Sequence, residues 1–177
     1  MICINKSLET GIVPTVLKQA KIVPLYKSGS KEEATNYRPI SLLPVFSKLL
    51  EKTVYNQFSK YFEQFITPVQ FGFRTKHSTV HCILNFLNNV SANRSSKYHV
   101  SVFLDLKKAF DTVPHNVLIE KLKSYGVKQT ELAWFSNYLS GRGQSTCVRN
   151  ATSALENILC GVPQGSILGP LLFFSFY

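Results

Sequence analysis

An apolar stripe at helical spacing is the feature that most constrains how this chain can fold. The stripe recurs every three or four positions and consists of Phe46, Leu50, Val54, Phe58, Tyr61 and Phe65. Such spacing places the side chains on one face of an α-helix, which buries that face against other elements. Pro68 follows the stripe and favours a stop there. The pattern therefore predicts a long helix over residues 45–65 inside a packed domain.

The rest of the chain alternates between helical and strand patterns. Further helices are predicted over residues 79–91, 114–125, from an N-cap at Thr130 to near Gly141, and from Ser166 onward, where Gly169 and Pro170 interrupt the pattern. Strands are predicted over residues 21–25 and 98–104, with a hairpin formed by residues 144–149 and 155–160. The apolar stripes, with Phe46, Phe58 and Trp134, are interpreted as core. The fold class expected from these patterns is α+β.

The amino-acid composition limits the kinds of binding partner and cellular compartment to be expected. Hydrophobic residues make up 45% of the 177 positions, which suits a packed core, and the net charge of +10 suits a phosphate-bearing partner or an anionic membrane surface. No apolar run approaches the roughly 20 residues of a membrane span, so no membrane is expected. The four cysteines show no C-x-x-C spacing, which indicates reduced thiols in the nucleus or cytoplasm rather than a zinc site or disulfide framework.

The chain contains only two aspartates, and both lie within nine residues. Asp105 directly follows the predicted strand 98–104, and Asp111 lies six positions later. A carboxylate held at a strand end is well placed to bind Mg²⁺ for phosphoryl chemistry. A helix cap or a solvated loop acid is the alternative for a single aspartate.

Five stretches together carry a family resemblance that no single one would establish. In chain order they are LKQAKIVPLYKSGS, NYRPISLLPVFSKLLEK, QFGFRTKHST, FLDLKKAFDTVPHNVLIEKL and GVPQGSILGPLLF. Their order and wording resemble the reverse transcriptases of non-LTR (LINE-type) retrotransposons, jockey-like ones in particular. The resemblance spans about residues 5–174.

The resemblance implies the fingers and partial palm of a right-hand polymerase, with the thumb absent. Residues 1–97 would be fingers-like and residues 98–177 partial palm. The implied activity is RNA-directed DNA synthesis from an RNA template, a DNA primer and deoxynucleoside triphosphates. Nucleotidyl transfer of this kind uses two metal ions, Mg²⁺ or Mn²⁺, about 3.5–4 Å apart.

The resemblance also implies roles for residues of the FLDLKKAFD segment. Asp105 matches the catalytic metal ligand, and the backbone carbonyl of Leu106 matches a second ligand. Phe110 matches the ring that excludes a 2′-hydroxyl from the sugar site, with core packing as the alternative. Asp111 belongs to the motif, but its place before Pro114 predicts that it caps the following helix.

Further residues match substrate-binding positions of the family. Lys27 and Arg38 match basic residues that bind the triphosphate, although a solvated turn is an equal alternative for Lys27. Gln164 and Gly165 match the segment beside the nascent base pair, and Ser166 is expected to cap the next helix. The template-binding residues implied by the match are Gln70, Gly72 and Arg74.

One element of the family pattern has no counterpart in this sequence. The Y/F-A-D-D box, which supplies the other catalytic carboxylates, would follow GVPQGS, yet no aspartate follows Asp111. A single aspartate does not organise two metal ions. The chain as given is therefore expected to be inactive, and the alternative is a non-catalytic remnant that binds nucleic acid through its basic surface.

Overall fold

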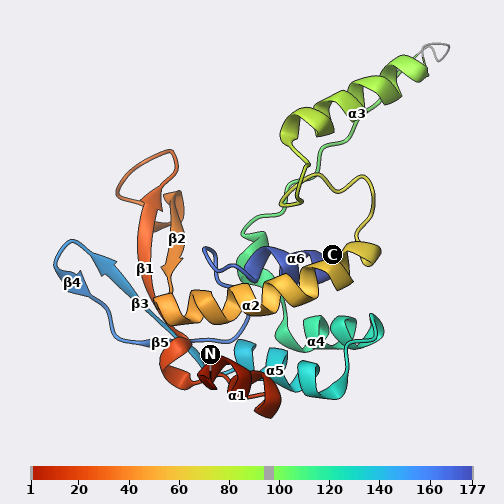
Figure 1. The fold of residues 1–177 in the computed structure, drawn as a ribbon. Helices are drawn as coiled ribbons and strands as arrows, with labels where there is room; N and C mark the ends of the chain where they lie inside the picture. Colours follow the sequence, from red (N-terminus) through yellow and green to blue (C-terminus); the bar gives the residue numbers. More distant parts are fainter. Residues whose placement is uncertain (1, 94–97, 177) are drawn as a thin grey trace. The chain divides into compact units, whose positions relative to one another are not determined.

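The computed structural model describes residues 2–93 and 98–176 (Figure 1). The chain divides into two compact units. The larger unit comprises Met1–Gln64 together with Lys108–Tyr177, and the smaller unit comprises Phe65–Lys107. The mixture of helices and strands confirms the α+β class, while the assignment of fingers and palm on either side of residue 97 stays a prediction.

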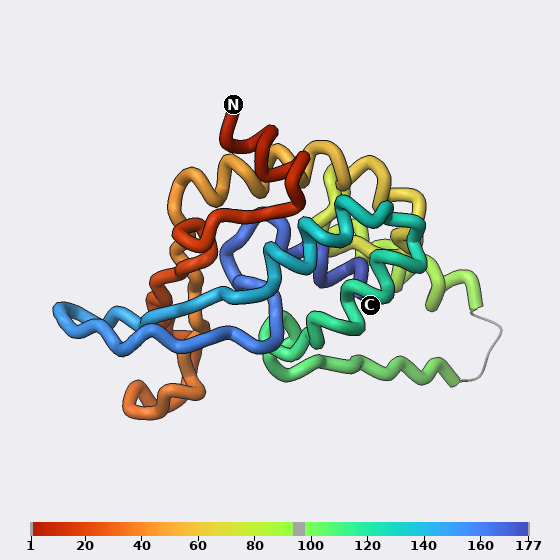
Figure 2. Tube along the Cα trace, turned by 90° about the horizontal axis from the view of Figure 1, so that it is seen from below, coloured from red at the N-terminus to blue at the C-terminus, as the bar shows by residue number. Residues whose placement is uncertain are grey.

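A mixed sheet forms one part of the larger unit. Its strands are β1 (Gln19–Tyr26), β2 (Tyr37–Leu42), β3 (Arg142–Val148), β4 (Ala151–Thr152) and β5 (Glu156–Ile158). The path runs β2-β1-β3-β4, and β5 also pairs with β3. β1 is antiparallel to β2 and parallel to β3, whereas β3 is antiparallel to β4 and β5. The hairpin of β3 and β4, blue in Figure 2, extends away from the helices of the larger unit.

The strand predicted at residues 21–25 and the hairpin around residues 150–153 are confirmed as β1 and as β3 with β4 and β5. β2 was not predicted, because Arg38 and Pro39 interrupt its apolar pattern. The structure explains how β2 accommodates Pro39, since β2 is an edge strand of the sheet and Pro39 lies opposite Pro24. A proline, which has no N–H to donate, is acceptable at a sheet edge.

Five α-helices complete the described part of the larger unit. They are α1 (Ile2–Thr10), α2 (Val45–Phe62), α4 (His115–Ser124), α5 (Gln129–Leu139) and α6 (Gly169–Phe176). Short 3-10 turns are η1 (Thr15–Leu17), η2 (Ala34–Asn36), η3 (Glu63–Phe65) and η4 (Ala109–Thr112). α2 with η3 covers the predicted helix over residues 45–65, and α4 confirms the helix after Pro114.

Two predicted helix starts are wrong in detail. α5 begins at Gln129 with Lys128 as its N-cap, so Thr130 lies inside the first turn rather than before it. α6 begins at Gly169, and Pro170 stands within its first turn rather than interrupting it. Proline suits that turn because its missing N–H would have had no partner inside the helix.

The core of the larger unit lies between its helices. Fully buried side chains come from α2, α4, α5 and α6, including Leu50, Val54, Leu118, Leu122, Trp134, Phe135 and Leu172. The expected core role is confirmed for Trp134 and, with partial burial, for Phe58. It is wrong for Phe46, which is 73% exposed because it lies in the first turn of α2, away from the other core helices.

The described residues of the smaller unit form the helix α3 (Thr79–Ala92) and an extended segment over residues 98–106, which contains no helix or strand (Figure 1). Ser78 caps α3, since its Oγ accepts from His81 N at 3.3 Å. The helix is confirmed, but none of its residues is buried, so its apolar stripe is not core. Residues 98–106 form no strand, and Val100 is 88% exposed. Within the described residues no other strand pairs with this segment, and alternation alone does not satisfy a strand's backbone groups.

Candidate functional site

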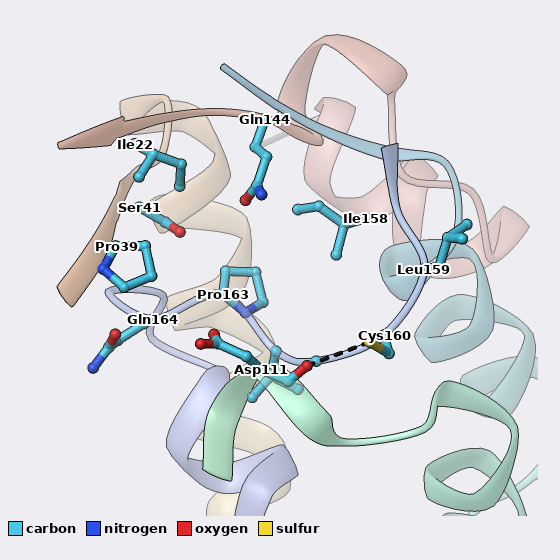
Figure 3. Close-up of a pocket in the computed structure, with 12 residues that line it drawn as sticks. Ile22, Pro39, Ser41, Asp111, Gln144, Ile158, Leu159, Cys160, Pro163 and Gln164 are labelled. Atoms are coloured by element: carbon cyan, nitrogen blue, oxygen red, sulfur yellow. Dashed lines mark hydrogen bonds between the residues drawn. The ribbon is translucent and has the colours of Figure 1, made fainter. Parts of the chain in front are cut away.

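A cavity of about 290 Å³ opens in the larger unit (Figure 3). Ile22 of β1, Ser41 of β2 and Gln144 of β3 line it from the sheet. The segment that includes Cys160 and Gln164 lines another side, together with Asp111 from η4. The cavity is therefore lined by residues that are far apart in the sequence, among them Asp111 of the FDTV segment and residues of the GVPQGS segment.

Backbone hydrogen bonds hold these two segments against each other. Val162 N donates to Phe110 O, and Gly161 N donates to Val113 O, both at 2.8 Å. The ring of His115 adds a bond, with Nε2–H donating to Gly161 O at 2.7 Å. Since His115 is the first residue of α4, this bond also ties the helix start to the cavity wall.

Gly161 makes this close pairing possible. Its φ of +85° lies in the left-handed region, and a Cβ there would stand 2.8 Å from the Cα and the carbonyl oxygen of Asp111. Only glycine fits both demands without displacing backbone. The Cys160 thiol also donates to Asp111 O at 3.3 Å, while remaining exposed at the cavity.

The other end of the loop is attached to β2. Ser41 N donates to Gln164 O at 2.8 Å. Gly165 has φ +115°, and a Cβ there would stand 2.8 Å from Ser41 O. Gln164 is half-buried and lines the cavity, where its carbonyl oxygen is bonded to Ser41 of β2. Gly165, the next residue, packs against the Ser41 backbone.

Asp111 is half-buried in the cavity wall, where burial raises the pKa of its carboxyl group while the charge of Lys108 partly opposes the shift. The prediction that it caps the following helix is wrong. The N-cap of α4 is Pro114, and no side chain supplies a capping hydrogen bond there. The physical reason is that residues 109–112 form their own 3-10 turn, which ends before α4 begins.

Phe110 lies on the other side of the same turn. Its ring stacks on Phe173 of α6 with centroids 4.6 Å apart and packs against the helical core. It does not line the cavity. This is the packing that was the alternative interpretation, and its role beside a sugar stays a prediction.

The structure brings Lys27 and Arg38 together but not into the cavity wall. Arg38 lies opposite Leu25, and Lys27 N donates to Asn36 O at 2.9 Å. Strand alternation therefore puts the two exposed basic side chains diagonally on one face of the β1–β2 hairpin. Pro39 and Ser41, which line the cavity, belong to the opposite face.

The predicted template residues lie within one loop of the smaller unit. Arg74 Nη1 donates to Thr67 O at 3.0 Å and to Gln70 O at 3.3 Å. Gln70 Nε2 donates to Gly72 O at 3.3 Å. The three residues Gln70, Gly72 and Arg74 are thus neighbours, with part of the Arg74 fork engaged in holding the loop.

Asp105 and Leu106 are exposed in the smaller unit, beyond any helix or strand. Among the described residues, no group of three His, Cys, Asp or Glu side chains could hold a metal ion. Asp105 therefore offers one carboxylate and no complete metal site, so the residues present do not fit a two-metal centre. Over residues 2–93 and 98–176, no helix is long and apolar enough to cross a membrane.

Gly161–Ser166 form the loop that lines the cavity, called the cavity loop below. Sequence reasoning missed a buried polar cluster beside this loop. Glu51 of α2 is fully buried and contacts Tyr138 of α5 and the backbone of Ile167. A signal existed, because Glu51 lies three positions before Val54 and so beside the apolar face of α2. An acid on an apolar helix face needs partners from elsewhere in the fold.

Comparison with known proteins agrees with these motifs. A family model described as reverse transcriptase (RNA-dependent DNA polymerase) matches residues 27–177. The RNA-directed DNA polymerase from mobile element jockey of Drosophila melanogaster is 35% identical over 97% of this chain. Probable RNA-directed DNA polymerases from transposon BS and transposon X-element of the same species are 38% and 39% identical over 97% and 96% of it.

The chain spans 19% of the length of each of these relatives. All three are named as polymerases of mobile elements, which confirms the jockey-like resemblance and does not favour the alternative of a non-catalytic remnant that binds nucleic acid through its basic surface. The chain belongs to the reverse transcriptase family.

Proposed function

We propose that this chain supplies the nucleotide-binding part of an RNA-directed DNA polymerase from a non-LTR retrotransposon. The observation that carries the proposal is the cavity, which is lined by Asp111, Gln164 and Ser41. Its volume of about 290 Å³ suits part of a nucleotide rather than a whole triphosphate. The sugar and base would enter the cavity, where Gln164 offers hydrogen bonds and Gly165 permits close approach of backbone.

The triphosphate would have to extend around the edge of the β1–β2 hairpin, because Lys27 and Arg38 lie on the face opposite Pro39 and Ser41, which line the cavity. Lys27 offers a point charge and Arg38 a planar fork, and both suit phosphate oxygens. Phe110 would border the sugar after a shift of its ring from Phe173. In this proposal residues 1–97 act as fingers and residues 98–177 as part of the palm.

The smaller unit would contact the RNA template and its DNA primer. Gln70, Gly72 and Arg74 would lie along the template strand, where arginine fixes the position of a phosphate without reading sequence. Asp105 and the carbonyl of Leu106 would contribute to a site for Mg²⁺ or Mn²⁺. Because one carboxylate does not hold two such ions, no catalytic step is assigned to this chain alone. The proposed compartment is the nucleus or cytoplasm, where the free cysteines stay reduced.

Protection of Cys160 tests the nucleotide site without requiring catalysis. The rate of alkylation by iodoacetamide would be followed at Cys160, which lines the cavity, and at exposed Cys3 of α1 as an internal control. With poly(rA)/oligo(dT) and Mg²⁺ present, dTTP is expected to slow the reaction at Cys160 several-fold and leave Cys3 unchanged. Equal rates at Cys160 with and without dTTP would contradict the proposal.

A primer-extension assay on the same template tests the assignment of chemistry. The chain alone is expected to incorporate no label above background with Mg²⁺ or Mn²⁺. Incorporation that disappears on Asp105→Ala would show that the residues present suffice for catalysis.

A further inference from the structure

A buried polar cluster stands behind the cavity loop, among apolar side chains of the larger unit. It comprises Glu51 of α2, Tyr138 of α5 and Arg142 of β3, with exposed fractions of 0%, 1% and 1%. None of the three lines the cavity. Buried ionisable groups cost free energy unless they are paired, so their placement calls for an account of what they hold.

Glu51 joins the core to the loop through its two carboxylate oxygens. Oε1 accepts from the hydroxyl of Tyr138 at 2.8 Å, and Oε2 accepts from the backbone N–H of Ile167 at 2.7 Å. Ile167 directly follows the Gly161–Ser166 segment. One carboxylate therefore links α2 and α5 to the residue at which the cavity loop ends.

The loop is fixed at the same point from within. The Ser166 hydroxyl donates to Pro163 O at 2.8 Å and accepts from Gly169 N at 2.9 Å. Ser166 thus supplies an acceptor for the first N–H of α6, as expected of a capping side chain, although it lies three positions before the helix begins at Gly169. With Ser41 bonded to Gln164 O, the loop is held on one side by β2 and on the other by Glu51.

Arg142 supplies the balancing charge without a direct ion pair. Its guanidinium lies over the Tyr138 ring at 4.8 Å, and Nη1 donates to Tyr138 O at 3.2 Å. Within residues 2–93 and 98–176, its Nε and Nη2 have no hydrogen-bond partner. Apolar side chains in place of the whole cluster would avoid the cost of burying these charges, so core stability alone does not call for the cluster, whereas an apolar residue at position 51 alone would leave Arg142 without a counter-charge.

We propose that Glu51 is a positioning residue that holds the cavity loop through the Ile167 amide, so that Gln164 stays directed at the bound nucleotide. The inference deepens the proposed nucleotide site and rests on it for the identity of the ligand. Its structural half, the control of the loop by Glu51, is measurable without any ligand.

Three substitutions separate positioning from general core support. Glu51→Met keeps the volume but leaves the Ile167 N–H without an acceptor. Glu51→Gln is the conservative variant, because its amide oxygen can accept from Ile167 while its NH₂ donates to the Tyr138 oxygen. Tyr138→Phe is the matched control, since it disturbs the same buried cluster yet leaves the bond between Glu51 and Ile167 intact.

The first readout is amide hydrogen exchange of the full chain, followed residue by residue by NMR. Exchange at Ile167 is expected to be about tenfold faster in Glu51→Met, as loss of one buried hydrogen bond implies. Glu51→Gln and Tyr138→Phe are expected to stay within about threefold of the unmodified chain. Equal acceleration in Glu51→Met and Tyr138→Phe would overturn the positioning role.

A measurement on the unmodified chain decides the case if Glu51→Met does not fold. The Ile167 amide is expected to exchange far more slowly than the amide of exposed Leu104 in the smaller unit. Exchange at Ile167 as fast as at Leu104 would mean that Glu51 does not hold the loop, and would overturn the proposal.

The second readout is protection of Cys160 by dTTP on poly(rA)/oligo(dT) with Mg²⁺. Half-protection is expected to need about tenfold more dTTP in Glu51→Met, and an unchanged concentration in Glu51→Gln. An unchanged concentration in Glu51→Met would overturn the link to nucleotide binding. If dTTP protects none of the variants nor the unmodified chain, the nucleotide site itself fails, whereas hydrogen exchange still decides whether Glu51 positions the loop.

Discussion

The helices α2 and α3 carry similar apolar stripes with opposite outcomes. In the larger unit, α2 buries Leu50 and Val54, which are 3% and 1% exposed. In the smaller unit, the corresponding stripe of α3 leaves Val80, Ile83 and Leu84 60%, 58% and 50% exposed. Periodicity therefore identifies the apolar face of a helix, but burial depends on whether other elements cover that face.

The extended segment of the smaller unit should show the contrast most strongly, in its susceptibility to proteolysis. Phe103 is 83% exposed and lies outside any helix or strand, whereas Phe135 is fully buried in α5. Chymotrypsin is expected to cut after Phe103 about a thousandfold faster than after Phe135, because cleavage at the core site requires a costly opening of the fold. Timed digestion with mass spectrometry measures both rates. Similar rates would mean that the two units are equally well ordered.

Matched leucine substitutions test the same comparison as stability. Leu122→Ala in α4 removes a fully buried side chain and should lower the free energy of unfolding by about 3 kcal/mol. Leu84→Ala in α3 removes a half-exposed one and should change it by about 0.5 kcal/mol or less. Urea denaturation followed by circular dichroism measures both values. A large loss for Leu84→Ala would show that α3 is covered by a packed surface in solution.

Glycine positions sharpen the comparison for the loops. Gly161→Ala places a Cβ 2.8 Å from the Asp111 backbone at a positive φ, and should cost about 2 kcal/mol of stability. Gly72→Ala in the smaller unit meets only the end of the flexible Gln70 side chain, at 3.4 Å, and Gly72 is not among the glycines with positive φ, so the variant should be neutral or more stable by about 0.5 kcal/mol.

Gly141→Ala separates the two causes at Gly161, since Gly141 has φ +61° with nothing within 4 Å of a Cβ. It should cost about 1 kcal/mol, which is the conformational part alone. The same urea denaturation serves for all three variants. Equal losses for Gly141→Ala and Gly161→Ala would mean that the contact with Asp111 relaxes easily.

Local sequence patterns predicted the helices and strands whose apolar spacing and flanking turn residues are sufficient to identify them. The long helix over residues 45–65, the strand β1 and the hairpin after Gln144 follow from apolar spacing and turn residues. The segment 98–104 shows where such reasoning ends. Alternation gives it the capacity to be a strand, but the described structure offers it no pairing partner, and pairing is a property of the whole sheet.

The residues of the candidate site also divide into those that a sequence motif identifies and those that only the folded chain reveals. Gln164 and Gly165 were chosen because they stand in a motif of the family, and of the two only Gln164 lines the cavity. Glu51 lies more than a hundred residues away from Ile167, so only the folded chain shows that the two are bonded. Lys27 and Arg38 were chosen from the family resemblance alone, and no sequence rule indicated that they lie on the face of the β1–β2 hairpin opposite Pro39 and Ser41, which line the cavity.

Acid titration should give the smallest effect and tests the consequence of burying Glu51 in the larger unit. Burial raises the pKa of the Glu51 carboxyl above its ordinary value of 4.5, although hydrogen bonds from Ile167 and Tyr138 and the charge of Arg142 oppose the shift. The folded chain therefore binds more protons than the unfolded chain between those two pKa values. Stability must fall as the pH rises through that window.

Glu51→Gln removes this dependence, because glutamine does not titrate. Asp111 contributes a similar dependence, since its pKa is also raised by burial, so the variant should retain part of the slope. Urea midpoints measured between pH 4 and pH 8 give the curves of the unmodified chain and of the variant. A slope in Glu51→Gln as steep as in the unmodified chain would assign the titration to Asp111 and leave Glu51 ionised throughout.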